Sequence, residues 1–276
     1  LLLKLNKSYY ELSNPLVNDS EYDKLKIENN ISGKLEFKNL WFAYNKKDYV
    51  LRNINFKINP GNVLAIVGST GSGKTSIINL INRFYEFNKG EVYLDENKLR
   101  DYNLNELRQV IGYVPQDVFL FSDTIRNNLT LGNKKISDNE IWDVIRYLKA
   151  ERFIEKLPGK LDYNVMERGA TLSVGQRQLL SCIRILLFDP KIILLDEATS
   201  SVDSETEEII QNAISKILKN RTSIVVAHRL STIKQADNIL VLENGEIVES
   251  GKHNELKRNN KHYSKLYKMQ FSKLAT

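Results

Sequence analysis

The sequence contains a glycine-rich run whose residue types and spacing suit the binding of phosphate groups. The run matches G-x-x-x-x-G-K-[ST] and lies between an apolar segment, residues 63–67, and a segment with helical spacing, residues 75–84. Glycines let successive backbone N–H groups point into one concavity, and the N-terminus of the helix adds a partial positive charge. The lysine adds a full charge, and the threonine hydroxyl is an oxygen ligand of the kind that Mg²⁺ prefers. The residues predicted to hold a nucleotide are Gly68, Ser69, Thr70, Gly71, Ser72, Gly73, Lys74, Thr75 and Ser76.

A second group with chemical potential is a pair of adjacent acids at the end of an apolar segment. Residues 192–195 are all apolar, and Asp196 and Glu197 follow directly. Open α/β sheets bind ligands at the carboxyl ends of their strands, so these carboxylates are expected close to a bound phosphate. Asp196 is the predicted partner of the Mg²⁺ shell, and Glu197 is predicted to polarise or position the attacking water. Capping of the following helix is the structural alternative, but it does not explain two acids together in a chain with a phosphate-binding loop.

These residues need a scaffold, and the pattern of apolar residues predicts strands that alternate with helices. Such alternation indicates a parallel sheet covered on both faces. Asn244-Gly245, between two apolar segments, is a strong hairpin signal because both residues tolerate positive φ. The predicted strands are residues 35–44, 54–58, 63–67, 111–114, 192–195, 223–227, 238–242 and 246–248, and the predicted helices are residues 75–84, 139–148, 176–188 and 205–218.

The run Leu172-Ser173-Val174-Gly175-Gln176 narrows the function, because a phosphate-binding loop alone suits kinases, GTPases, helicases and repair ATPases equally. Here the sequence resembles the ATP-binding cassette (ABC) family, whose signature is LSGGQ, over residues from about 34 to 256. Val174 departs from the family pattern, which has glycine, and a β-branched residue is strained wherever the backbone needs positive φ. Ser173 and Gly175 can still donate to a phosphate through a hydroxyl and a backbone N–H.

Other elements of the family occur in the expected order along the chain. The resemblance implies that Tyr44 stacks on adenine, that Gln116 senses Mg²⁺ and the membrane partner, and that His228 contacts the γ-phosphate. It also implies that Ser201-Val202-Asp203 crosses a dimer interface. Taken alone, a strand aromatic, a glutamine or a histidine more often has an ordinary structural role, so the order along the chain carries this interpretation.

The resemblance implies an α/β fold of the P-loop NTPase class: a RecA-like core, an N-terminal antiparallel β subdomain and an α-helical signature subdomain at about residues 117–188. Two cassettes would pack head to tail, so that each ATP lies between one phosphate-binding loop and the partner's signature. The implied ligands are ATP and Mg²⁺, and the implied partner is a second cassette in a homo- or heterodimer. The residues implied to be catalytic are Lys74, Gln116, Glu197 and His228, and those implied to hold Mg²⁺ are Thr75, Gln116 and Asp196.

Three segments resemble exporters in which the cassette and a transmembrane domain share one chain. They are residues 196–199 (Asp-Glu-Ala-Thr), residues 121–128 and Glu167-Arg168-Gly169. The resemblance implies a motor domain at the cytoplasmic face of the bacterial inner membrane, with residues 1–33 as the connection to a fused transmembrane domain. The alternatives are the ATPase subunit of an importer and a DNA-repair ABC ATPase. The latter would need a heptad-rich or zinc-bearing insertion, which residues 75–172 lack. The cargo stays open among lipids, drugs and peptides.

The net charge of +6 invites a nucleic-acid interpretation, but its distribution argues against one. Residues 1–251 are balanced, and the excess lies in residues 252–276, which carry seven basic residues and one acid. Apolar residues at roughly helical spacing there predict a solvated C-terminal helix with a basic outer face. We therefore expect an ATPase domain at residues 34–251, a basic helical tail at 252–276 and no nucleic-acid partner.

The single cysteine, Cys182, excludes a disulfide scaffold or a cysteine-rich metal site and suits a reducing compartment. It lies on an apolar helical stretch and is expected to be a small core residue. The longest apolar runs are far shorter than the ~20 residues that span a bilayer. His253 and His262, in the tail, receive no predicted role.

Overall fold

The structure is a computed structural model, and it describes residues 31–45, 48–196, 204–227 and 229–271. Its strands are β1 (Leu35–Phe42), β2 (Leu51–Ile58), β3 (Val63–Gly68), β4 (Lys89–Leu94), β5 (Asn97–Lys98), β6 (Ile111–Val114), β7 (Ile192–Asp196), β8 (Thr222–Val226), β9 (Asn238–Glu243) and β10 (Glu246–Gly251). Its α-helices are α2 (Lys74–Ile81), α3 (Leu104–Val110), α4 (Ile125–Thr130), α5 (Asp138–Tyr147), α6 (Glu151–Glu155), α7 (Val174–Phe188), α8 (Ser204–Leu218), α9 (Leu230–Gln235), α10 (His253–Arg258) and α11 (His262–Phe271). Three short 3₁₀ helices are η2 (Leu99–Asp101), η3 (Lys160–Asp162) and η4 (Glu167–Gly169).

The strands form two sheets, and the larger one is the predicted parallel sheet. Its order is β10-β9-β3-β8-β7-β6, in which β6, β7, β8, β3 and β9 run parallel and β10 is an antiparallel edge. Side chains alternate across a strand. Leu64 and Ile66 of β3 therefore face one core, and Ala65 and Val67 face another. Because both faces are covered, the strands read as uninterrupted apolar runs, which is why the sequence located them.

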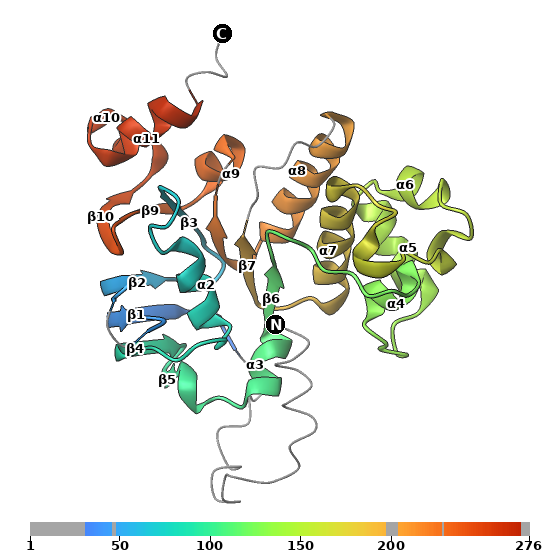
Figure 1. The fold of residues 1–276 in the computed structure, drawn as a ribbon, viewed down its shortest axis with the longest axis horizontal. Coiled ribbons are helices and arrows are strands. Elements are labelled where there is room, and N and C mark those ends of the chain that lie inside the picture. The colour runs from blue at the N-terminus through green and yellow to red at the C-terminus, as the bar shows by residue number, and fades with distance from the viewer. Residues whose placement is uncertain (1–30, 46–47, 197–203, 228, 272–276) are drawn as a thin grey trace, which may run out of the picture.

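The smaller sheet is antiparallel and has the order β2-β1-β4-β5. The core that contains Leu64 and Ile66 fills the space between the two sheets and around α2. Figure 1 shows β1, β2 and β4 to the left of α2 and below β3 in the view. The predicted first strand ran to residue 44, whereas β1 ends at Phe42. Strand β4 escaped prediction because only Val92 and Leu94 of its six residues are buried, so its apolar pattern is short.

A helical region, which contains α4, α5 and α6, extends to the right of the larger sheet in Figure 1. Helices α4 and α5 pack against α7, and their apolar residues join the core on the α7 face of the sheet. The fully buried amide of Asn128 ties this region together: it accepts a hydrogen bond from the backbone N–H of Phe121 (2.8 Å) and donates to the carbonyl oxygens of Phe121 and Thr124 (3.0 Å each). Cys182 of α7 is buried in the same core, as the sequence indicated.

The C-terminal part begins with the predicted hairpin, in which Asn244 and Gly245 both have positive φ (50° and 81°) between β9 and β10. The tail that was predicted to follow it as a helix with a basic outer face is helical. The segment forms two helices, α10 and α11, and their apolar side is buried, including Leu256 and Tyr263. The backbone N–H of Tyr263 donates to the Glu249 carboxylate (2.6 Å), so β10 holds α11 in place.

None of the helices in the described ranges combines the length and the apolar character that crossing a membrane requires.

Candidate nucleotide-binding site

The glycine-rich loop turns tightly between β3 and α2. Gly73 is the N-cap of α2 with φ 103°, and a Cβ built on it would lie 2.6 Å from Leu51 Cδ2. Both the backbone conformation and the space therefore require glycine at this position. Thr75, in the first turn of α2, is exposed. Within the loop Ser69, Thr70 and Gly71 are also exposed, whereas Gly68, Ser72, Gly73, Lys74 and Ser76 are buried.

The Lys74 side chain folds across its own loop. Its Nζ donates to the carbonyl oxygens of Gly68 (3.0 Å) and Ser69 (2.8 Å), and the residue is only 7% exposed. Burial lowers the pKa of Lys74 from its ordinary value, and the negative charge of Asp196 opposes this shift. The loop carbonyls and Asp196 together hold a buried positive charge at the start of α2.

The carboxyl ends of the parallel strands bring the other predicted residues to the same edge of the sheet. The neighbouring strands are β3, β8, β7 and β6, with Ile66 beside Val226 and Asp196 beside Val226 in the register. Asp196 is buried and ends β7 on the face that carries Ile192 and Leu194, which is the α2 face. Gln116 follows β6 and is exposed. Glu197, Ser201, Val202, Asp203 and His228 lie outside the described residues, although Glu197 directly follows β7 and His228 follows β8 by two positions.

Thr75, Gln116 and Asp196 supply a hydroxyl, an amide oxygen and a carboxylate, which is an all-oxygen donor set. Such ligands suit Mg²⁺, which keeps several waters and needs few protein ligands. Thr75 and Gln116 are exposed where a hydrated ion can reach them, and buried Asp196 lies within electrostatic range of Lys74. The residues present at this edge therefore fit a magnesium ion.

Tyr44 lies beside the start of α2. Its hydroxyl is 3.0 Å from Ser76 Oγ, and its ring meets Tyr85 edge-on at 4.9 Å between centroids. The side chain is nevertheless 51% exposed, so part of an aromatic surface stays accessible next to the loop. Tyr85 was not identified from the sequence, and only its aromatic character in the segment after α2 could have suggested it.

Tyr113 of β6 was also not predicted from the sequence as a residue of the site. Its side chain packs into the core on the α2 face of the sheet, the face toward which Asp196 points. Burial and the neighbouring charge of Asp196 raise the pKa of Tyr113 to about 12. The alternation of side chains along the four residues of β6 was the only signal in the sequence. It places Tyr113 near Asp196 only when β6 is known to pair with β7.

The signature run forms the start of α7. Ser173 is the N-cap: its Oγ accepts from the backbone N–H of Gln176 (3.2 Å), and its own N–H donates to Gln176 Oε1 (2.9 Å). The Arg177 guanidinium donates to the Leu172 carbonyl (2.6 Å) and fixes the preceding loop. Val174 occupies the first helical position, is 39% exposed and is not among the residues with positive φ. The backbone strain considered for Val174 therefore does not arise.

The phosphate-binding loop and the signature belong to opposite faces of the larger sheet. Residues of α2 pack into the core between the sheets, and residues of α7 pack into the core on the other face. Figure 1 shows α2 and α7 on either side of β6 in the view. The structure thus brings Tyr44 and Asp196 to the loop, and it does not bring the signature to them. Gln116 follows β6 at the same edge of the sheet.

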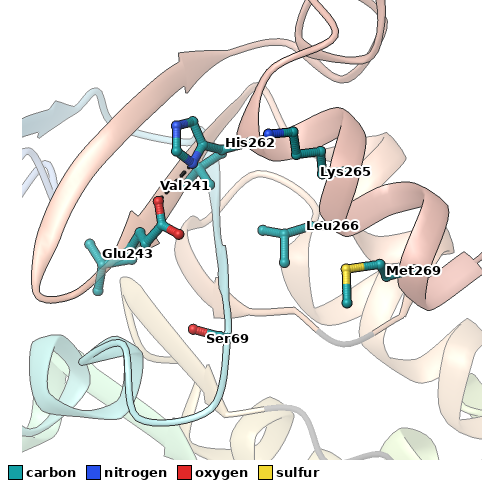
Figure 2. A pocket seen from close by; sticks show the side chains of 8 residues that line it. Ser69, Val241, Glu243, His262, Lys265, Leu266 and Met269 are labelled. Carbon is teal, nitrogen blue, oxygen red and sulfur yellow. Dashed lines mark ion pairs between the residues drawn. The ribbon is translucent and has the colours of Figure 1, made fainter.

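A separate pocket borders the loop at Ser69. Its volume is about 180 Å³, and β9 and α11 form its other walls (Figure 2). His262 Nδ1 lies 2.6 Å from Glu243 Oε2 across this pocket, so a histidine without a predicted role links α11 to β9. Lys74, Thr75, Asp196 and Gln116 are not among the lining residues, and the pocket therefore lies beside the phosphate site.

Comparison with known proteins identifies the family. Residues 51–200 match the ABC transporter family. The chain belongs to this family. It is 46% identical over 238 residues to a probable multidrug resistance ABC transporter ATP-binding/permease protein of Bacillus subtilis, a match that covers 86% of this chain and 35% of that protein. It is 45% identical over 258 residues to the ATP-dependent lipid A-core flippase of Escherichia coli K12, covering 92% of this chain and 44% of the flippase.

A solved structure agrees with these relatives. The structure of a bacterial Atm1-family ABC exporter with ATP bound superposes with a TM-score of 0.83 at 35% identity, over 91% of this chain and 44% of that one. The P-loop NTPase fold and the family resemblance read from the sequence are thereby confirmed. The chain is an ATP-binding domain of an ATPase family, and it spans less than half the length of the relatives it matches.

Proposed function

We propose that this chain is the ATP-hydrolysing motor domain of a bacterial ABC exporter and that it works as a head-to-tail dimer around two ATP molecules. The observation that carries the proposal is the separation of the phosphate-binding loop and the signature onto opposite faces of one sheet. The N-termini of α2 and α7 lie on opposite faces of the sheet in one chain, but in a head-to-tail dimer the α2 of one chain and the α7 of the other can hold the same ATP. The identity with ATP-binding/permease proteins supports the export assignment.

Nucleotide binding uses residues of the loop and its surroundings. Backbone N–H groups of residues 68–75 and the Lys74 ammonium hold the phosphates, and the exposed face of Tyr44 stacks on the adenine ring. Asp196, Thr75 and Gln116 hold Mg²⁺, which when bound neutralises charge that develops on the phosphate oxygens. Lys74 is already buried and held by the carbonyls of its own loop before a nucleotide binds.

Hydrolysis is an in-line attack of water on the γ-phosphate. Glu197 orients that water and accepts its proton, and His228 donates to the γ-phosphate. The partner's signature completes the site. The hydroxyl of its Ser173 donates a hydrogen bond to the γ-phosphate, and the free N–H groups of the first turn of its α7 face the same phosphate. Release of the γ-phosphate removes these contacts, so the two cassettes separate. The Ser201-Val202-Asp203 segment crosses the same interface.

The mechanical output is delivered to a transmembrane domain fused to the cassette, at the cytoplasmic face of a bacterial membrane. Relatives described as a multidrug transporter and a lipid A-core flippase support an amphipathic, lipid-like or drug-like cargo. An importer subunit is the second candidate, and the relatives that combine ATP-binding and permease parts in one protein disfavour it.

Glu197→Gln tests the proposal. The variant should bind ATP normally, reduce phosphate release at least 100-fold and increase the ATP-dependent dimer in size-exclusion chromatography. Glu208→Gln is the matched control, because Glu208 is an exposed carboxylate on α8 and should leave all three measurements unchanged. Undiminished phosphate release by Glu197→Gln would refute the assigned role of Glu197. A wild-type chain that binds no ATP would refute the proposal as a whole.

A further inference from the structure

The Ser72 side chain is a buried polar group within the phosphate-binding loop that has no hydrogen-bond partner among the described residues. It is 2% exposed, and its Oγ is left unpaired although the backbone N–H of the same residue donates to the Ser69 carbonyl (3.2 Å). A buried hydroxyl without a partner destabilises a fold, and alanine would fill almost the same space without that penalty. We therefore expect the Ser72 hydroxyl to have a hydrogen-bond partner in another state of the loop.

Ser72 Oγ lies directly against Gly68. A Cβ built on Gly68 would be 2.7 Å from this oxygen and 2.2 Å from the Leu242 carbonyl of β9, so Gly68 has no room for a side chain. The Gly68 carbonyl now accepts a hydrogen bond from Lys74 (3.0 Å), and the Ser69 carbonyl accepts a second one from the same ammonium (2.8 Å). The nearby loop acceptors are thus occupied by Lys74.

A lysine ammonium has three donors, and this number limits what Lys74 can hold. Two donors serve the loop carbonyls, which leaves one for a nucleotide. A contact to one phosphate group uses that third donor and disturbs neither carbonyl. Simultaneous contacts to the β- and γ-phosphates need two donors, so one loop carbonyl must lose its partner.

We propose that Ser72 then donates to the Gly68 carbonyl in place of Lys74, and that its hydroxyl thereby favours ATP over ADP. Ser72 is suited to this exchange because its buried hydroxyl has no partner among the described residues and its oxygen already lies against Gly68. The inference rests on the proposed nucleotide site and adds a residue that senses the γ-phosphate through Lys74. Ser72 is a positioning residue, since its side chain acts on the loop carbonyl and not on the nucleotide.

Ser72→Ala tests the proposal through two measurements that should move in opposite directions. The thermal midpoint of the chain without nucleotide should stay the same or rise, because an unpaired buried hydroxyl is removed. Affinity for ATP, measured with a fluorescent ATP analogue and by competition with ATP, should fall about threefold to tenfold, the range expected for one hydrogen bond. Affinity for ADP in the same competition should change less than about twofold.

Ser223→Ala provides the matched control. Ser223 is a fully buried serine of β8 whose Oγ donates to the Arg221 carbonyl (3.1 Å), so its loss should lower the thermal midpoint and leave the ratio of ATP to ADP affinity unchanged. An unchanged ATP to ADP ratio in Ser72→Ala, with normal ATP binding by the wild type, would overturn this inference alone. Equal losses for both nucleotides would also overturn it, because they would indicate a general defect of the loop. Absence of ATP binding by the wild type would instead reject the proposed function.

Discussion

The phosphate-binding loop and the signature both place the N-terminus of a helix where a phosphate can bind, but they are built differently. The loop lies at the carboxyl edge of a parallel sheet, and its lysine is buried and bonded to its own carbonyls. The signature begins the 15-residue helix α7, and Ser173 and Val174 are exposed. The loop is therefore a complete binding element within one chain, whereas the signature is a surface that needs something brought to it.

The two regions also differ in how their key polar groups can change partners. Lys74 must release a loop carbonyl to hold two phosphate groups, because its three donors are limiting. Ser173 needs no such exchange, since its oxygen can keep accepting from the Gln176 N–H while its proton is donated to a phosphate. The loop thus rearranges on binding, and the signature is ready as it stands.

Lys74→Ala should have the largest effect. Removing the buried ammonium takes away a charged hydrogen-bond donor to the phosphates, and we expect ATP affinity to fall about 10- to 100-fold. Equilibrium binding of a fluorescent ATP analogue checks this. Lys57→Ala removes an exposed lysine of β2 and should bind like the wild type. Undiminished binding by Lys74→Ala would contradict a loop that is complete within one chain.

Ser173→Ala should have the next largest effect, and only on turnover. Loss of the donor to the partner's phosphate should lower the ATPase rate at least tenfold while binding of ATP to the loop is kept. Loss of the cap should also lower the stability by about 1 kcal/mol. Ser137→Ala separates the two effects, because Ser137 and Glu140 form the same capping box on α5. Equal ATPase rates in the two variants would show that Ser173 acts as a helix cap and has no role in hydrolysis.

The pH dependence of ATP binding should show a smaller effect of the same buried lysine. Burial lowers the pKa of Lys74, and a deprotonated lysine no longer attracts phosphates. Affinity should therefore fall several-fold as the pH rises toward 10.5, and the fall should begin at a lower pH than for an exposed lysine. Titration calorimetry across this range, with circular dichroism to confirm folding, checks the sign. A constant affinity up to pH 10.5 would argue against the buried ammonium as a phosphate ligand.

Val174→Gly should have the smallest effect. Val174 is the first helical residue of α7 and half-exposed, so its side chain neither strains the backbone nor fills a core. Turnover should stay within about twofold of the wild type, and the lower helix propensity of glycine should reduce stability by only about 0.3 kcal/mol. A collapse of the ATPase rate would show that this side chain contacts the partner.

The sequence predicted those parts of the fold that are fixed by local pattern. Strand β6 matches the expected residues 111–114, and the other parallel strands agree within about two residues, because strands buried on both faces read as apolar runs. Strands β4 and β5 and helices α3, α4, α6 and α9 were missed. They are short or half-exposed, so they show no clear period, and their place depends on tertiary packing.

The same distinction between local pattern and tertiary packing applies to the residues of the site. The glycine-rich loop, the end of β7 and the signature are contiguous motifs, so spacing alone located them. The proximity of Tyr113 to Asp196 and the burial of Ser72 depend on which strands are neighbours and on how closely β9 approaches the loop. Neither relation is encoded in a short stretch of sequence. The same holds for α11. Its amphipathic spacing indicated a helix but could not show that the Glu249 carboxylate would accept a hydrogen bond from the Tyr263 N–H.

The burial of Cys182 makes this chain convenient for spectroscopy. It is the single cysteine of the sequence, and its burial raises the thiol pKa to about 12, so almost no thiolate is present at neutral pH. Maleimide reagents, which attack thiolates at the surface, should therefore leave the native chain unlabelled. One cysteine introduced at an exposed position can then carry a single fluorophore without any background substitution, and energy transfer between two such chains would test the proposed opening and closing of the cassettes in real time.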